Sequence, residues 1–404
     1  MTSSRSDDDR LRAWFITPAA AALSVTLASA TGAAQEVGAR RGGTGVTSPE
    51  VAQDRRVTFR LRAPEAKAVT VSGDFGNDVD MRRSADGIWT ASVGPLDPEM
   101  YVYSFTVDGV RLTDPSNPQV KIGYVTSTTT SLLTVRGDSP PFYDVQDVPH
   151  GELRTLLYKS RSNGVTRELT VYLPPGYEEA RNRRYPVLYL LHGFANDHHS
   201  WHRYGRANDI LDNLLVQRAI EPFLVVMPLG YGGAHVNGDG TGIAPEGAGA
   251  FGGDAALYER DLLEDIVPMI DRKYRTIADR RSRAIVGFSM GGGQAGRFGL
   301  RHLETFSRVG IMSAGMAGGP ETEPLATLAA NAARSNKLID LLWIACGRED
   351  TAVKGARMLH QTLEQSGIEH TYLETDGAHH WRVWRRYLRD LAPLLFKSAA
   401  PPRP

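Results

Sequence analysis

The chain has 404 residues, of which 41% are hydrophobic, enough for two globular domains or one large one. Lys plus Arg and Asp plus Glu both number 46, so no overall charge attracts the chain to nucleic acid or to an anionic membrane. Cys346 is the only cysteine, which excludes an intramolecular disulfide, and its apolar neighbours predict a buried, inert thiol.

The first 34 residues are typical of an export signal. Two arginines precede a weakly apolar stretch, and small residues at 28–30 and again at 32–34 offer cleavage sites. An uncleaved membrane anchor is the alternative, but Pro18 and several polar residues make the stretch a poor spanning helix. We therefore expect a signal peptide over 1–34, a secreted or periplasmic protein, and no stable membrane span.

Strand patterns dominate the stretch from 55 to 137. In "YVYSFTVDG", alternate residues from Tyr101 to Val107 share one face, and the Asp-Gly pair that follows predicts a hairpin turn. No helical pattern interrupts this stretch, so we expect a small all-β sandwich over 55–137.

The character of the sequence changes after a proline-rich segment, "GDSPPFYDVQDVPHG", which predicts a linker over 138–151. Beyond it, nearly continuous runs of Val, Ile and Leu alternate with amphipathic helical patterns. Such alternation is typical of a mainly parallel sheet covered by helices on both faces. We therefore expect an α/β domain over 152–397.

A nucleophile is predicted within "AIVGFSMGGGQAG". The G-x-S-x-G pattern alone is weak, but here it follows a buried-strand run and precedes small residues that can open a helix. Gly287, Gly291 and Gly292 leave room for the strand and the helix to approach closely. Ser289 is therefore predicted to lie on a sharp strand-to-helix turn, with its hydroxyl clear of the sheet.

A serine nucleophile requires a histidine base and an acid, here expected in the order Ser, Asp, His. "ACGRED" ends one strand and places Asp350 in the next loop, and "TDGAHHW" places His379 in a loop before the last helix. Residues that follow parallel strands converge at one edge of the sheet, so these groups can meet Ser289. Glu349 remains an alternative acid and His380 an alternative base.

An oxyanion hole is expected from two backbone amides. One belongs to Met290, directly after the nucleophile, and Phe194 in "LLHGFAND" is our choice for the other. His192 precedes the serine, so we expect it to be structural.

The substrate side of the site is less defined. Trp201, Tyr231 and Trp381 can line a pocket for an aromatic acid or fill the core. A glycine-rich segment, 231–253, is either a wall of that pocket or disordered. The histidines of "DHHSWH" suggest a metal, but no established zinc spacing is present, so we expect a polar loop, no metal and no cofactor.

Taken together, residues 140–397 resemble the esterase D-like branch of α/β-hydrolases, in particular feruloyl esterases of carbohydrate esterase family one. The resemblance depends on "PPFYDVQDVPHG", "VYLPPGY", "YPVLYLLHGF" with Trp201 downstream, "DLLEDIVPMID", "GFSMGG", "CGRED" and "GAHHWRVWRRYL". It implies the same roles for Ser289, Asp350 and His379. His379 fits better than His380 because the family histidine stands five residues before a tryptophan, here Trp384.

Residues 55–137 resemble an early-set immunoglobulin-like module of the glycogen-binding type, through "VSGDF", "DGIW", "YVYSFTVDG" and "DPSNP". Starch-binding members carry two exposed tryptophans where this chain has Asp78 and Arg111. The aromatic residues Trp89, Tyr101 and Tyr103 are expected to fill the core. A packing or spacing role is therefore our leading interpretation of the module.

The resemblance implies a secreted serine carboxylic ester hydrolase that acts through an acyl-enzyme on feruloyl or acetyl esters of plant cell-wall xylan. An acyltransferase or siderophore esterase of the same branch is the alternative, and a non-catalytic glycan-binding protein is a more distant one. The expected partner is a carbohydrate-linked ester, and no nucleic acid. The acyl group, sugar backbone and oligomeric state stay open.

Overall fold

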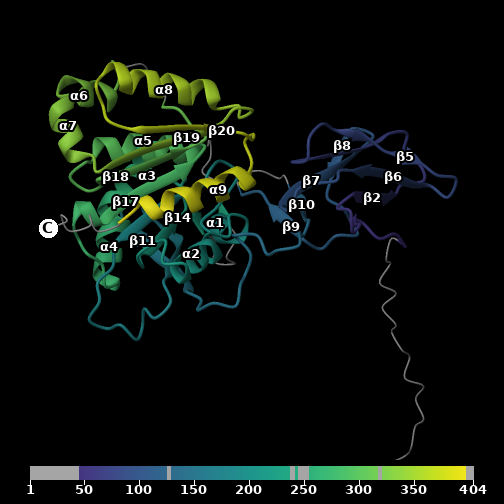
Figure 1. Ribbon diagram of the computed structural model, residues 1–404, viewed down its shortest axis with the longest axis horizontal. Coiled ribbons are helices and arrows are strands. Elements are labelled where there is room, and N and C mark those ends of the chain that lie inside the picture. The colour runs from purple at the N-terminus through teal and green to yellow at the C-terminus, as the bar shows by residue number, and fades with distance from the viewer. Residues whose placement is uncertain (1–44, 125–128, 237–241, 244–253, 317–320, 397–404) are drawn as a thin grey trace, which may run out of the picture. The chain divides into compact units, whose positions relative to one another are not determined.

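Figure 1 shows a computed structural model of the chain, which describes residues 45–124, 129–236, 242–243, 254–316 and 321–396. Two compact units divide the chain, residues 1–42 and 43–404. The expected signal peptide at 1–34 lies outside the described residues. Within the described ranges, no helix has both the length and the apolar character needed to cross a membrane.

The N-terminal module contains two antiparallel sheets. One has the strand order β1-β2-β6-β5, and the other has the order β4-β3-β7-β10-β9 with β8 paired to β7. The strands are β1 (Glu50–Val51), β2 (Val57–Arg62), β3 (Val69–Gly73), β4 (Val79–Asp80), β5 (Arg82–Arg83), β6 (Ile88–Val93), β7 (Met100–Val107), β8 (Val110–Leu112), β9 (Val120–Ile122) and β10 (Thr129–Thr134).

The module core forms between these sheets and agrees with the sequence pattern. Trp89, Tyr101 and Tyr103 are buried in one hydrophobic cluster, which confirms that they fill the core. Asp108 and Gly109 both have positive φ values, 47° and 86°, and join β7 to β8 in the expected hairpin.

The α/β part is organised around one sheet with the strand order β11-β12-β14-β13-β17-β18-β19-β20. The pairs β11–β12 and β12–β14 are antiparallel, and all later neighbours are parallel. The strands are β11 (Glu152–Ser160), β12 (Val165–Leu173), β13 (Val187–Leu191), β14 (Leu224–Pro228), β17 (Arg283–Phe288), β18 (Arg308–Met312), β19 (Leu341–Gly347) and β20 (Thr371–Thr375). A separate short hairpin pairs β15 (His235–Val236) with β16 (Gly242–Ile243).

Helices cover both faces of this sheet, which explains why β13 is apolar throughout. Its residues alternate between two hydrophobic clusters, with Tyr189 on one face and Leu188 on the other. Figure 1 shows α5 and α8 on one side and α1, α2 and α9 on the other, in agreement with those clusters. The fold is therefore the expected α/β-hydrolase arrangement, preceded by an all-β module.

The bounds of the helices follow the chain. They are α1 (Ser200–Arg203), α2 (Ala207–Val216), α3 (Ala255–Arg260), the π-helical η1 (Asp261–Ile266), α4 (Val267–Lys273), the short 3₁₀ turn η2 (Arg280–Ser282), α5 (Met290–Arg301), α6 (Leu325–Ala330), α7 (Ala332–Leu338), α8 (Val353–Gln365), α9 (Trp381–Leu391) and the 3₁₀ turn η3 (Ala392–Leu394).

Cys346 lies in β19 and is fully buried, as its apolar neighbours predict. Burial raises the pKa of its thiol to about 12, and the nearby carboxylate of Asp350 adds to this effect. Because the thiolate is the reactive form of cysteine, this group is chemically inert near neutral pH.

Candidate active site

Ser289 occupies the turn between β17 and α5. Its φ and ψ angles are 55° and −122°, a conformation that non-glycine residues rarely adopt and that costs free energy. The turn is fixed on both sides, because the amide of Ser289 donates to the carbonyl of Met312 at 2.9 Å and its carbonyl accepts from Gly293 at 3.0 Å. The hydroxyl is thus held at the carboxyl edge of the sheet.

Two glycines around the turn are required by close backbone approach. A Cβ atom on Gly287 would lie 2.3 Å from the carbonyl oxygen of Gly291, and one on Gly291 would lie 2.4 Å from the carbonyl oxygen of His192. Both contacts are with backbone atoms, which cannot move aside as a flexible side chain can. The small residues that the sequence places here are therefore steric requirements of the turn.

The structure brings Ser289, Asp350 and His379 together from three loops at the carboxyl ends of β17, β19 and β20. The Nε2 atom of His379 lies 2.9 Å from the hydroxyl oxygen of Ser289. Its Nδ1 atom lies 2.8 Å from Oδ1 of Asp350. With Asp350 ionised, Nδ1 carries the proton and donates it to the carboxylate, which leaves Nε2 to accept the serine proton.

The carboxyl group of Asp350 is almost completely buried, at 2% exposure. Burial alone would raise its pKa, but hydrogen bonds from His379 and from the amide of Ala352 outweigh burial and lower the pKa below its usual value. Asp350 is therefore an anion at neutral pH and can stabilise a positive charge on His379.

The alternative acid and base make other contacts. The carboxylate of Glu349 accepts a hydrogen bond from the amide of Gly377 at 2.6 Å. Nδ1 of His380 lies 3.2 Å from Oδ1 of Asp74. Neither side chain bonds to Ser289 within the described part of the chain, so the geometry favours Asp350 and His379.

The loop after β13 lies against the serine turn. A Cβ atom on Gly193 would come within 3.1 Å of the Cβ atom of Ser289. Phe194, the next residue, packs with Met290 around one small buried cluster. The two segments expected to supply oxyanion donors therefore meet beside the serine.

His192 fixes this loop and has the structural position expected of it. Its Nε2 atom accepts a hydrogen bond from the amide of Gly230 at 2.8 Å, so the proton is on Nδ1, which donates to the carbonyl of Gly193 at 2.8 Å. Burial lowers the pKa of His192 to about 4, so the ring is neutral at physiological pH.

A cavity of about 740 Å³ opens beside Ser289 and His379. Its wall is mostly apolar and includes Met290, Phe298 and Met316, with Arg297 as its charged member. The size is within the range of small-molecule sites, about 300–1,000 Å³. Sequence reasoning missed the contribution of α5, although positions three, four, seven and eight residues after a helix start share one face with it.

The aromatic residues suggested for the pocket are elsewhere. Trp201, Tyr231 and Trp381 are 1%, 0% and 5% exposed, and none of them lines the cavity. The two tryptophans pack edge-on against each other and against Phe288, behind the serine turn. Their apolar area is used by the core, which corrects this part of the sequence interpretation. Most of the glycine-rich segment 231–253 lies outside the described residues.

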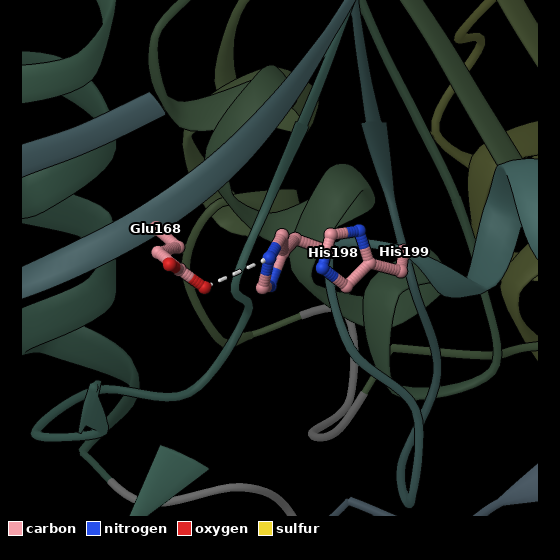
Figure 2. Close-up of side chains that lie close together, drawn as sticks. All are labelled: Glu168, His198 and His199. Atoms are coloured by element: carbon pink, nitrogen blue, oxygen red, sulfur yellow. Dashed lines mark ion pairs between the residues drawn. The ribbon is translucent and has the colours of Figure 1, made fainter. Parts of the chain in front are cut away.

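The histidine-rich loop also contains a group that sequence reasoning missed. Figure 2 shows the side chains of Glu168, His198 and His199 close together, and one ligand atom from each lies within 4.8 Å of the other two. Glu168 is on β12, far earlier in the chain, so no local spacing could reveal this cluster.

The sheet order, the strained serine turn and the hydrogen-bonded Ser, His and Asp side chains define an α/β-hydrolase. Residues 160–394 match the protein family described as "Putative esterase", and this match covers more than half of the chain. The chain belongs to this esterase family, whose members hydrolyse carboxylic esters. Residues 44–120 match "Carbohydrate-binding module 48 (Isoamylase N-terminal domain)".

Individual relatives agree with the family assignment. An "Endo-1,4-beta-xylanase/feruloyl esterase" of Xylanibacter ruminicola is 31% identical over 86% of this chain, but the chain spans only 46% of that protein. A solved "ferulic acid esterase" is 25% identical with a TM-score of 0.50, and the match covers 61% of this chain and 97% of that one.

The enterochelin esterase of Shigella flexneri has a TM-score of 0.65 over 90% of this chain and 98% of its own, with 16% identity. That identity supports a likeness in fold alone. The match nevertheless covers more of this chain than the α/β part, since residues 152–397 make up about three fifths of it.

Proposed function

We propose that the chain is a secreted serine esterase that removes feruloyl or acetyl groups from xylan through an acyl-enzyme intermediate. The observation that carries this proposal is the hydrogen-bond chain from Ser289 through His379 to Asp350 beside the cavity. Secretion is supported by the export-signal pattern at the N-terminus.

In the first step, Nε2 of His379 takes the hydroxyl proton while the oxygen of Ser289 attacks the ester carbonyl carbon. The backbone amides of Phe194 and Met290 donate hydrogen bonds to the developing oxyanion. His379 then gives its proton to the leaving alcohol, and the acyl group stays on Ser289. Asp350 orients the imidazole and stabilises its positive charge.

In the second step, water attacks the acyl-enzyme as His379 takes one of its protons. Collapse of the tetrahedral intermediate releases the acid and restores the serine hydroxyl when His379 returns the proton. No redox cofactor takes part in this sequence, because protons and electron pairs balance among the enzyme, the ester and water.

The proposed acyl group is supported by the cavity and by two relatives. Methionine and phenylalanine side chains in the wall suit the flat ring of a hydroxycinnamate, and two of the relatives are named feruloyl or ferulic acid esterases. Arg297 forms no ion pair within the described residues and lines the same cavity. Its guanidinium would favour substrates that carry a phenolate or carboxylate.

The experiment compares kcat/KM for methyl ferulate, acetylated xylan and a triscatecholate siderophore, with Ser289→Ala as the inactive control. We expect one of the first two substrates to be preferred by at least tenfold. A preference for the siderophore would support the alternative siderophore esterase, and transfer of the acyl group to an added sugar in place of water would support an acyltransferase.

A further inference from the structure

Outside the proposed catalytic residues, the structure gathers three metal-ligating side chains. Glu168 comes from β12, and His198 and His199 come from the loop between β13 and α1. Figure 2 shows the carboxylate of Glu168 directed at the ring of His198, with the ring of His199 beyond it. Oε2 of Glu168 lies 3.3 Å from Nε2 of His198, and the two imidazole rings are 3.9 Å apart between centroids.

His198 is buried without a hydrogen-bond partner. Its side chain is 6% exposed, and neither ring nitrogen makes a hydrogen bond within the described residues. A buried polar group left unpaired costs about 1–3 kcal/mol, so a partner for this ring would stabilise the fold. Burial, aided by the neighbouring His199, lowers the pKa of His198 to about 3, which keeps the ring in the neutral form that binds metals.

His199 has one nitrogen engaged and the other available. Its Nδ1 atom lies 3.3 Å from the hydroxyl of Thr170 and 3.2 Å from Nε2 of His202. A proton on Nδ1 that is donated to such a partner leaves a lone pair on Nε2. Metal-binding histidines in proteins show this arrangement, because the second hydrogen bond fixes the tautomer and the direction of the ring.

We propose that Glu168, His198 and His199 bind a zinc ion, with water as the fourth ligand. Two imidazole nitrogens and one carboxylate oxygen are a ligand set that Zn²⁺ accepts. At bond lengths near 2.1 Å, tetrahedral ligand atoms stand about 3.5 Å apart, so the cluster must contract by about 1 Å. Glu168 and His199 are only partly buried, which leaves them free to make this adjustment.

The ion would connect the sheet to the loop that carries Phe194. That loop is already held by the hydrogen bond from Tyr231 to the carbonyl of Asn196 and by the contact of Asp197 with Ser200. A metal bridge from β12 to His198 would restrain it further. The site is therefore structural and independent of the ester chemistry, which needs no metal, and it replaces our sequence-based expectation of a metal-free polar loop.

The experiment uses the full chain without a histidine tag, stripped with EDTA, dialysed and titrated with ZnCl₂ by isothermal calorimetry. We expect one ion per chain and a melting temperature that rises with zinc concentration. Glu168→Gln and His199→Gln replace partly exposed side chains, and each should weaken zinc binding at least tenfold. The control is His360→Gln, which alters a separate histidine pair on α8 that is hydrogen-bonded to His370 at 2.8 Å.

Circular dichroism establishes that each variant is folded before titration. Retention of tight zinc binding in both cluster variants would overturn the proposal, and so would its loss in the His360 variant alone. Absence of zinc binding by the unaltered chain would overturn it as well. Loss of zinc binding with unchanged esterase activity would support the site as structural, whatever the outcome for the proposed substrates.

Discussion

The hydroxyl of Ser289 is the atom on which the proposed reaction depends. Ser289→Ala removes the nucleophile without adding bulk to the strained turn, so we expect kcat for p-nitrophenyl acetate to fall about 10⁴-fold. The melting temperature should stay within a few degrees of the unaltered chain. Retention of most of the turnover would show that another group performs the attack. Ser366→Ala, at the end of α8, is a control that should leave turnover unchanged.

His192 makes stability depend on pH. Its pKa is about 4 in the folded chain and near 6.5 in the unfolded chain, so the unfolded chain binds more protons between these values. Its contribution is therefore fully present above pH 6.5 and is lost as the pH falls toward 4, by up to about 3 kcal/mol.

The test of this linkage compares His192→Gln with the unaltered chain by urea unfolding at several pH values. The glutamine can still accept from Gly230 but does not titrate. The difference in free energy of unfolding between the two proteins should shrink between pH 7 and pH 4. Parallel pH profiles would contradict a buried, neutral His192.

At the level of single residues, the sequence was informative where chain order and strand ends constrain chemistry. Ser289, Asp350 and His379 were chosen because parallel strands end at one edge, and the structure places them in hydrogen-bonding contact. Trp201 and Trp381 were ambiguous, because an aromatic side chain near a site can face the core or the cavity. Only packing decides between the two, and here it assigns them to the core.

Among the elements, the β17–α5 turn has the least space. Gly291→Ala would press a Cβ atom against the backbone of the loop after β13, so we expect a loss of about 1–3 kcal/mol in the free energy of unfolding and a large loss of activity. Gly293→Ala is the matched control in the same helix, since its nearest contact would be 3.6 Å, an ordinary distance. Alanine favours helix there, so the control should be neutral or more stable by up to about 1 kcal/mol. Equal stabilities by chemical denaturation would contradict this account of the turn.

The elements that the sequence could predict are those with a strong period. The apolar runs of β13, β17 and β19 and the amphipathic pattern of α9 are such cases. The π-helical η1 was not predictable, because it depends on a distant contact. Its Asp261 pairs with the completely buried Arg167 at 3.0 Å, and that guanidinium also donates to three carbonyls of residues 229–234.

Across the whole molecule, a buried ion pair joins the module to the α/β part within the compact unit 43–404. Arg385 of α9 is completely buried and donates to the carboxylate of Glu99 at 2.6 Å and to the carbonyl of Tyr204 at 2.6 Å. This contact supports a packing role for the module. No sequence pattern could have paired residues so far apart, because neither lies in a recognisable motif.

Glu99→Gln should therefore destabilise the chain by about 3 kcal/mol, since it leaves a buried guanidinium without its counter-charge. The control is Glu50→Gln, which removes the exposed partner of Arg60 and should cost less than about 1 kcal/mol. Calorimetric melting of both variants measures the difference. Equal effects would argue that the module contributes little to the stability of the α/β part.

The account depends most on Ser289 being activated by His379. The most direct measurement is mass spectrometry of the digested chain after reaction with a fluorophosphonate, a reagent that modifies activated serines. We predict a single adduct, on the peptide that contains Ser289, and its absence both in His379→Ala and after heat denaturation. An adduct on a different residue, or equal labelling of the His379→Ala variant, would contradict the proposed mechanism.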